Sequence, residues 1–307
     1  MTTPTGDPLP SWRRGATKTA LLDFLLAART VPVAERVAMF DNDGTLWCEK
    51  PQYLQLLFML DQLQRAVAAD PAIAARPEFR ALIEDDHAAQ AELGLERIAL
   101  ALIQLTVGLG PREFDDRVRA FFAAAVDPAR GVPFRHLRYQ PMLELIDALR
   151  AESFSVFIVT GGGTEFVRAI SQDFYGVPPE GVVGTLVNYD FTRDAQGAPR
   201  LARSAERLGT ANEGAAKVVN IQRELGRRPI FAAGNSAGDR EMLEYALASG
   251  GPSLALLVDH DDADREYAYE PAALTVAFAG SFTALAHESG WTVASMRQDW
   301  EQVFADT

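Results

Sequence analysis

The sequence has 307 residues, of which 48% are hydrophobic, and a formal net charge of −13. This composition excludes a disordered or fibrous chain and suffices to bury the core of an α/β domain that carries an insertion. The acidic excess argues against nucleic acid and against an anionic membrane surface as partners. Cys48 is the single cysteine, so an internal disulfide bond is excluded and nothing in the sequence demands an oxidising compartment.

The amino-terminal segment leads to an expectation about location. Residues 1–14 are rich in proline and polar residues and lack the leading apolar stretch of a secretory signal. The apolar run at residues 21–28 is too short and too interrupted to cross a bilayer. We therefore expect a cytoplasmic protein without a membrane partner.

The most informative motif follows an apolar run at residues 37–40 that is typical of a buried strand. Asp41 and Asp43 come directly after this strand, and Gly44 ends the extended segment. Residues two apart on an extended segment point to the same side, so the two carboxylates can converge beyond the carboxyl end of the strand, where α/β folds bind ligands. Two like charges at close range require a cation, and oxygen ligands without neighbouring histidine or cysteine favour Mg²⁺ over zinc. The alternative is an ordinary strand-to-turn junction with solvated acids.

The segment 41–45, which reads Asp-Asn-Asp-Gly-Thr after an apolar strand, resembles the first motif of the haloacid dehalogenase superfamily of phosphatases. This resemblance implies a Rossmann-like parallel sheet and a phosphoryl-transfer site that uses Mg²⁺. It also implies that Asp41 is the nucleophile, that Asp43 is the general acid and base, and that both lie at the metal site.

The interval between this motif and the next strand is helical in pattern. It contains three segments with apolar residues at helical spacing, and no run in it alternates like a strand. These segments are residues 53–67, 95–107 and 113–125. We expect an α-helical cap at residues 51–138, inserted into a core formed by residues 1–50 and 139–307. This arrangement resembles the phosphoserine phosphatase-like branch of the superfamily, in which a helical cap supplies specificity and its closure excludes water.

A second apolar strand is expected at residues 154–159, followed by Thr160, three glycines and a helical run at residues 164–174. The free N–H groups at a helix start and the Thr160 hydroxyl can bind phosphate oxygens, and glycine lets the backbone approach closely. On its own, a strand followed by glycines also fits a tight turn. The segment resembles the second motif of the superfamily, which implies that Thr160 and Gly161 contact the phosphate.

Lys217 lies at the start of an amphipathic helix that ends near Gly226. A lone lysine on a helix is usually a solvated charge. Its place between the second motif and the next strand resembles the third motif of the superfamily, which is a lysine. This resemblance implies that Lys217 pairs with Asp41 and with the phosphate and keeps the nucleophile ionised.

The fourth motif follows an apolar strand expected at residues 229–233 and reads Gly-Asn-Ser-Ala-Gly-Asp from Gly234 to Asp239. It resembles the metal-binding loop of the superfamily, but Asn235 stands where that loop has its first acid. An amide oxygen can bind Mg²⁺, although it contributes no charge. The resemblance implies that Asn235 and Asp239 both belong to the metal site, and the choice of the direct ligand between them stays open. A helix N-cap is the alternative for Asp239.

Further strands are expected in the second half of the chain. Residues 181–185 and 199–201 suggest a small β-excursion, and residues 254–258 and 274–278 suggest the last core strands. The acidic segment at residues 259–264 leaves a strand end on the side of the expected active site. It fits a solvated loop, and a substrate-binding or supporting role stays open.

Together the motifs predict a magnesium-dependent phosphatase that hydrolyses a small phosphomonoester in two steps. Asp41 attacks phosphorus to form a phosphoaspartate, while Asp43 protonates the leaving oxygen and then deprotonates the attacking water. A dehalogenase shares the fold but lacks the second acid, so Asp43 argues against that activity. A phosphotransferase or phosphomutase on the same core stays open, as does a catalytically silent phosphate-binding protein, for which Asn235 is the warning sign. The sequence names neither the substrate nor the oligomeric state.

Overall fold

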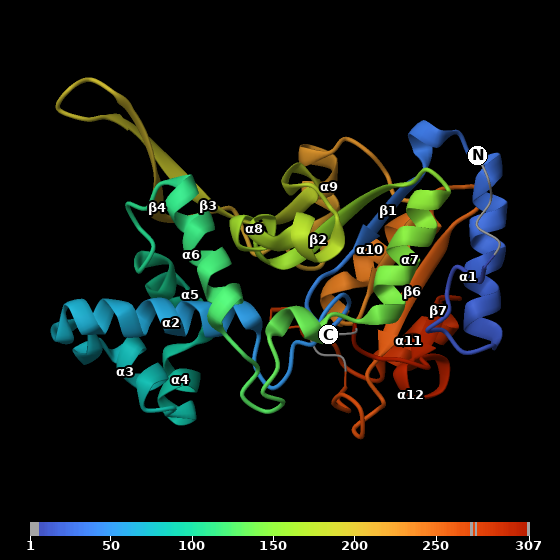
Figure 1. Ribbon diagram of the computed structural model, residues 1–307, viewed down its shortest axis with the longest axis horizontal. Helices are drawn as coiled ribbons and strands as arrows, with labels where there is room; N and C mark the ends of the chain where they lie inside the picture. The colour runs from blue at the N-terminus through green and yellow to red at the C-terminus, as the bar shows by residue number, and fades with distance from the viewer. Residues whose placement is uncertain (1–5, 271–272, 274, 306–307) are drawn as a thin grey trace.

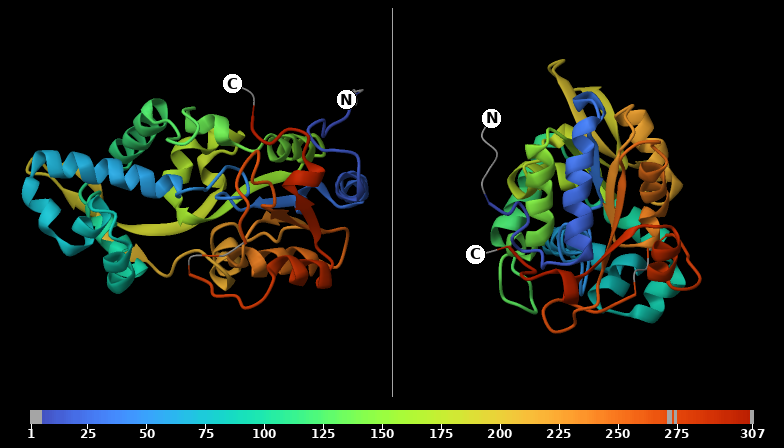
Figure 2. Two further views of the ribbon diagram at one scale, coloured as in Figure 1. Left: turned by 90° about the horizontal axis from the view of Figure 1, so that it is seen from below. Right: turned by 90° about the vertical axis from the view of Figure 1, so that its right-hand side faces the viewer.

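The computed structural model describes residues 6–270, 273 and 275–305. Its centre is a seven-stranded sheet with the order β4-β3-β2-β1-β5-β6-β7, in which β4 runs antiparallel to β3 and the other neighbouring pairs are parallel. The strands are β1 (Val37–Phe40), β2 (Ser155–Gly163), β3 (Val182–Arg193), β4 (Pro199–Leu208), β5 (Phe231–Gly234), β6 (Leu254–Asp259) and β7 (Thr292–Ser295). This mostly parallel sheet with helices on both faces confirms the predicted Rossmann-like α/β fold (Figures 1 and 2).

Two hydrophobic cores lie on opposite faces of the sheet because successive side chains of a strand alternate between the faces. In β1, Ala38 and Phe40 belong to one core, and Val37 and Met39 belong to the other. The first core includes residues of α1 (Ala16–Ala27), α7 (Gln140–Ala151) and α8 (Thr164–Tyr175), and the second includes residues of α9 (Ala215–Glu224), α10 (Arg240–Leu247) and α11 (Phe282–Glu288). Burial on both faces explains why β1 consists of apolar residues alone.

A group of helices follows β1 in the chain and lies at the end of the sheet away from α1 (Figure 1). These helices are α2 (Leu54–Ala69), α3 (Pro77–Ile83), α4 (His87–Leu93), α5 (Leu95–Gln104) and α6 (Pro111–Ala124). Three of them, α2, α5 and α6, lie where helical spacing predicts helices. The other two have seven residues each, which is too few for a clear apolar period. The proposed division into a core and a cap at residues 51–138 stays a prediction.

The expected β-excursion is a long hairpin that joins the core sheet to the helical group. The first residues of β3 pair in parallel with β2, and its remaining residues pair antiparallel with β4. Arg203 of β4 then bonds to the connection between α5 and α6: its N–H donates to Leu109 O at 2.9 Å, and its carbonyl oxygen accepts from Gly108 N–H at 2.9 Å. The hairpin therefore connects the core sheet to the helical group, as Figure 1 shows.

The prediction for the last core strand was wrong. Residues 275–278 form no strand, and residue 274 lies outside the described residues. The edge position beside β6 is taken by β7, whose Ala294 is fully buried, whereas Phe278 is 36% exposed. Burial of apolar surface therefore selects the later segment for the edge.

No helix in the described part of the chain is long and apolar enough to span a lipid bilayer.

Candidate active site

Three sequence motifs meet at one edge of the sheet because they follow parallel strands. Phe40, the last residue of β1, pairs with Ile158 of β2 on one side and with Ala233 of β5 on the other. The N–H of Asp41 donates to the carbonyl oxygen of Ala233 at 2.9 Å. The residues that follow these strands therefore emerge side by side at the carboxyl edge, where α/β sheets bind ligands.

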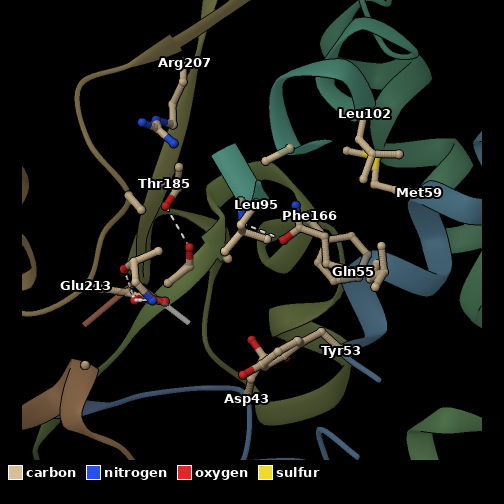
Figure 3. A pocket seen from close by; sticks show the side chains of 18 of the residues that line it. Asp43, Tyr53, Gln55, Met59, Leu95, Leu102, Phe166, Thr185, Arg207 and Glu213 are labelled. Atoms are coloured by element: carbon tan, nitrogen blue, oxygen red, sulfur yellow. Dashed lines mark hydrogen bonds between the residues drawn. The ribbon is translucent and has the colours of Figure 1, made fainter. Parts of the chain in front are cut away.

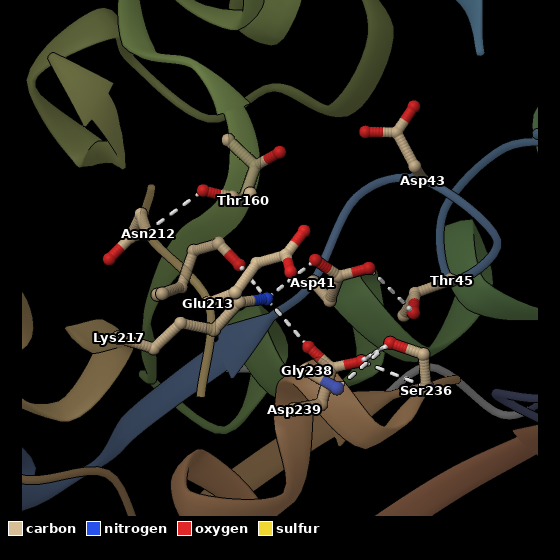
Figure 4. A network of polar contacts seen from close by, with 12 residues as sticks. Asp41, Asp43, Thr45, Thr160, Asn212, Glu213, Lys217, Ser236, Gly238 and Asp239 are labelled. Carbon is tan, nitrogen blue, oxygen red and sulfur yellow. Dashed lines mark hydrogen bonds and ion pairs between the residues drawn. The ribbon is translucent and has the colours of Figure 1, made fainter. Parts of the chain in front are cut away.

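Lys217, which α9 carries, lies at the centre of the polar network in Figure 4. Its ammonium nitrogen lies 2.7 Å from Asp41 Oδ1, 2.6 Å from Asp239 Oδ1 and 2.8 Å from the carbonyl oxygen of Val159. The side chain is fully buried, and these three acceptors match its three N–H donors. The charge of Lys217 would therefore attract an anion from a distance. A direct hydrogen bond from Lys217 to the anion would have to replace one of these three acceptors.

Burial and neighbouring charges set the ionisation of this cluster. Burial, followed by the charge of Asp239, raises the pKa of Asp41 well above its ordinary value, and Lys217 opposes this shift. Burial alone would lower the pKa of Lys217, but the carboxylates of Asp239 and Asp41 outweigh it and raise the pKa above the ordinary value. A carboxylate nucleophile must be ionised, so an additional cation beside Asp41 would suit the chemistry.

Asp43 lies near Asp41, but Figure 4 shows its carboxylate turned away from Lys217 and Asp41. The indole N–H of Trp47 donates to Asp43 Oδ1 at 2.9 Å. A Cβ added at Gly162 would lie 3.8 Å from Asp43 Oδ2, so this carboxylate faces the glycine run. Burial raises the pKa of Asp43 above its ordinary value, against the hydrogen bond from Trp47. A raised pKa suits an acid that must deliver a proton near neutral pH.

The loop after β5 gives Asn235 and Asp239 different surroundings. Both carboxylate oxygens of Asp239 accept hydrogen bonds within the protein. Oδ1 accepts from Lys217 Nζ, and Oδ2 accepts from the N–H groups of Asn235 and Ser236 at 3.1 and 3.0 Å. Asn235 Oδ1 lies 3.4 Å from Thr45 Oγ1, which in turn lies 3.3 Å from Asp41 Oδ2. This geometry favours Asn235 as the oxygen ligand and Asp239 as the residue that shapes the loop. Both roles stay predictions.

The glycines after Thr160 do not form a tight turn, because β2 continues in extended conformation through Gly163. The Thr160 hydroxyl accepts a hydrogen bond from the N–H of Gly162 at 2.9 Å. A Cβ added at Gly161 would lie 2.9 Å from Glu213 Oε1, so close approach explains the glycine there. The proposed contacts of Thr160 and Gly161 with phosphate stay predictions.

Sequence reasoning missed a buried network that supports the turn after Asp43. His260 Nε2 lies 2.8 Å from the carbonyl oxygen of Gly44, and His260 Nδ1 lies 3.2 Å from Glu266 Oε2. Glu266 Oε1 accepts from the Cys48 thiol at 2.9 Å and from the Tyr139 hydroxyl at 3.0 Å. The acidic segment at residues 259–264 is therefore not wholly solvated. A histidine placed directly after a strand that ends at the active-site edge is the signal that could have revealed it.

The donor atoms present fit a magnesium ion better than a zinc ion. Across the described residues, no group of three or more His, Cys, Asp and Glu side chains is arranged to hold a metal. Mg²⁺ is commonly bound by one or two carboxylates and keeps several waters, so Asp41 with the amide oxygen of Asn235 is a sufficient protein contribution. Zinc would instead require several histidine, cysteine or carboxylate ligands.

Comparison with known proteins assigns the family. The sequence model of the haloacid dehalogenase-like hydrolase family matches residues 38–244, which is more than half of the chain. No curated protein matches this chain. A solved structure of a protein of unknown function from Bordetella pertussis Tohama I is 19% identical, with a TM-score of 0.54 over 84% of this chain and 97% of that one. This likeness supports the fold.

Two further solved structures have lower TM-scores. A phosphoserine phosphohydrolase-like protein from Francisella tularensis is 15% identical, with a TM-score of 0.39 over 82% of this chain and 99% of that one. A probable phosphoserine phosphatase from Vibrio cholerae is 13% identical, with a TM-score of 0.41 over 85% of this chain and 66% of that one. The match to the family model decides the assignment: this chain belongs to the haloacid dehalogenase-like hydrolases.

Proposed function

We propose that this protein hydrolyses phosphomonoesters through a phosphoaspartate on Asp41, with Mg²⁺ as its cofactor. The contact of 2.7 Å between Lys217 Nζ and Asp41 Oδ1 carries this proposal. It fixes a buried carboxylate at the end of a core strand and beside a glycine-rich segment, which is the arrangement that a nucleophile toward phosphate needs. Membership of a hydrolase family supports the proposal.

The two acids divide the work of the reaction. In the first step, a carboxylate oxygen of Asp41 forms a bond to phosphorus, the bond to the leaving oxygen breaks, and Asp43 gives that oxygen a proton. In the second step, Asp43 takes a proton from water, the water oxygen bonds to phosphorus, and Asp41 is released with inorganic phosphate. The N–H of Gly161 and the Thr160 hydroxyl would orient the phosphate oxygens.

The metal would be held by Asp41 and Asn235, which follow β1 and β5, and the predicted place of Asp43 at this metal site stays a prediction. When bound, Mg²⁺ would neutralise charge on the phosphate oxygens. Lys217 and Asp239 would serve the site by holding Asp41 and the Asn235 loop in place, because their polar atoms are already paired within the protein.

Two further predictions, and one alternative, complete the proposal. Residues 51–138 would act as the cap that closes over the site, as in the phosphoserine phosphatase-like branch. The protein would act in the cytoplasm as a small-molecule enzyme. Transfer of the phosphoryl group to a second substrate instead of water would need an acceptor hydroxyl, and no observation favours it over hydrolysis.

Isotope labelling shows which atom the water attacks, and trapping of the phosphoenzyme tests the intermediate itself. In a single turnover of 4-nitrophenyl phosphate with Mg²⁺ in ¹⁸O-labelled water, we expect one labelled oxygen in the released phosphate and none in the peptide that contains Asp41. This result follows because water attacks phosphorus and not the carboxyl carbon. Label in Asp41 would indicate ester hydrolysis of the dehalogenase kind, and full activity after exhaustive chelation would remove the metal from the mechanism.

A further inference from the structure

A cavity of about 560 Å³ extends from the candidate active site into the space beside α2, α5 and the β3–β4 hairpin. Its volume lies within the range of about 300–1,000 Å³ that is typical of small-molecule pockets. Asp41 and Asp43 line one end. Figure 3 shows Asp43 and Tyr53 at that end, with Met59 and Leu102 on the far side. A molecule held by its phosphate at Asp41 would therefore place its remaining atoms in this cavity.

The wall of the cavity away from the aspartates is largely apolar. Six side chains of this wall come from α2, α5, α6 and α8: Leu56, Met59, Ile98, Leu102, Phe114 and Phe166. The apolar residues of α5 that line it, at positions 95, 98, 99, 102 and 103, have the spacing of a single helix face, and Glu96 lines it beside them. Ile98 and Leu102 of this face are each only 7% exposed and belong to the hydrophobic core, so the cavity borders on packed apolar side chains.

The charged residues in the same wall already pair with each other. Arg203 contacts Glu165 at 3.3 Å, and its side chain is only 3% exposed. Arg207 contacts both oxygens of Glu96, at 2.9 and 3.2 Å. Among the described lining residues beyond the catalytic end, both arginines therefore have acid partners and none is left for an anionic group of a ligand.

Two glutamine side chains of the wall each use one of their two amide atoms within the protein. Gln55 Oε1 accepts from the N–H of Gly163 at 2.7 Å, and Gln90 Nε2 donates to the carbonyl oxygen of Ala81 at 3.0 Å. A polar or charged ligand body would lose its water here and find few free partners, which costs free energy. An apolar body would lose little and would gain by leaving water.

We propose that the substrate is a phosphomonoester whose leaving group is uncharged and apolar, with an alkyl or aryl body that fills this cavity. This inference rests on the proposed function, which brings the phosphate to Asp41. Recognition then has two parts. The phosphate is bound at the strand ends, and the apolar body is bound by the face of α5 that lines the cavity. A small charged body, such as that of a phosphorylated amino acid, would bind poorly.

Non-hydrolysable ligands separate binding from catalysis. We would measure by calorimetry, in the presence of Mg²⁺, the dissociation constants of n-alkylphosphonates from methyl to octyl. Each buried methylene should tighten binding by about fourfold, since it contributes about 0.8 kcal/mol, until the cavity is full. The phosphonate analogue of phosphoserine should bind more weakly than propylphosphonate.

A matched pair of variants locates the effect in the cavity. Ala99 lines the cavity on α5, whereas Ala91 on α4 is exposed and does not line it. Ala99→Phe should weaken octylphosphonate binding by about 15-fold, the loss of room for about two methylenes, and leave methylphosphonate binding unchanged. Ala91→Phe should change neither.

The outcomes distinguish this inference from the proposed function. Equal affinity along the alkyl series, no measurable binding of any member, or equal effects of the two variants would overturn the apolar substrate class. Hydrolysis of phosphomonoesters is measured in parallel with alkyl phosphates. Chain-length-dependent binding without hydrolysis of any phosphomonoester would uphold the apolar cavity and overturn the phosphatase proposal.

Discussion

The side-chain amide of Asn235 lies beside the carboxylate of Glu49, with 3.5 Å between Asn235 Nδ2 and Glu49 Oε1. Both residues are buried, at 2% and 5% exposure, and Gly44 packs against them. With Nδ2 next to Glu49, the amide oxygen is left on the side of Thr45. The acidic side chain that the loop lacks at position 235 is therefore present at position 49, and an acid at both positions would place two buried carboxyl groups together.

The first prediction follows from this pairing. Without metal, Asn235→Asp should destabilise the protein by about 1–3 kcal/mol, because it replaces a hydrogen bond by like-charge contact in a buried place. The added charge should also tighten Mg²⁺ binding, so Mg²⁺ should stabilise this variant more than the native protein. Urea unfolding with and without Mg²⁺ measures both effects.

The double variant Asn235→Asp with Glu49→Gln is the control for this pairing. It exchanges the acid and the amide between the two positions and should recover most of the stability that the single variant loses. If the double variant is no more stable than Asn235→Asp alone, the two side chains are not coupled.

The second prediction separates the roles of the two acids. Asp41→Asn should abolish turnover and phosphoenzyme formation, because no carboxylate remains to attack phosphorus. Asp43→Asn should still form phosphoenzyme slowly from 4-nitrophenyl phosphate, whose leaving group needs little protonation, and should fail with alkyl phosphates. Rapid-quench trapping of an acid-stable acyl phosphate measures both, and identical complete loss in the two variants would contradict this division.

The third prediction concerns Gly44, where a Cβ would lie 2.0 Å from Asn235 Nδ2 and where φ is +73°. Gly226, which follows the end of α9, is the control, since its φ is +61° and a Cβ there would meet nothing within 4 Å. Gly226→Ala should cost only the backbone strain of about 1–2 kcal/mol, whereas Gly44→Ala should cost more and weaken Mg²⁺ binding by displacing Asn235. Urea unfolding and Mg²⁺ titration test this, and equal costs would rule out the close contact.

The fourth prediction concerns pH and stability. Burial would raise the pKa of Glu266, but the adjacent His260 and hydrogen bonds from Cys48 and the N–H of Tyr267 outweigh it and lower the pKa below the ordinary value of 4.5. A carboxyl with a lower pKa in the folded state stabilises the protein above its unfolded pKa, and this contribution is lost as pH falls through the folded value. Glu266→Gln should therefore be less stable at pH 7 and lose less stability between pH 5 and pH 3. Parallel loss in both proteins over that range would contradict the assignment.

Local patterns in the sequence determined the elements that depend on neighbouring residues. The apolar run at residues 37–40 forms β1, because a strand buried on both faces needs apolar residues throughout. The helical spacing at residues 164–174 covers most of α8, because a helix buried on one face needs apolar residues at that period. Motif order along parallel strands also placed Asp41, Lys217 and Asn235 near one edge of the sheet, as the structure does. Their catalytic and metal-binding roles stay predictions.

Only the tertiary structure decided which distant residues support that edge. Glu49 and Asn235 are 186 positions apart, and His260 is 216 positions from the Gly44 carbonyl that it contacts. The edge strand β7 replaced the predicted segment at residues 274–278, and the hairpin of β3 and β4 extended far enough to reach the helical group. Such contacts have no local pattern, because their free energy depends on how all the packed elements share buried surface and hydrogen-bonding partners.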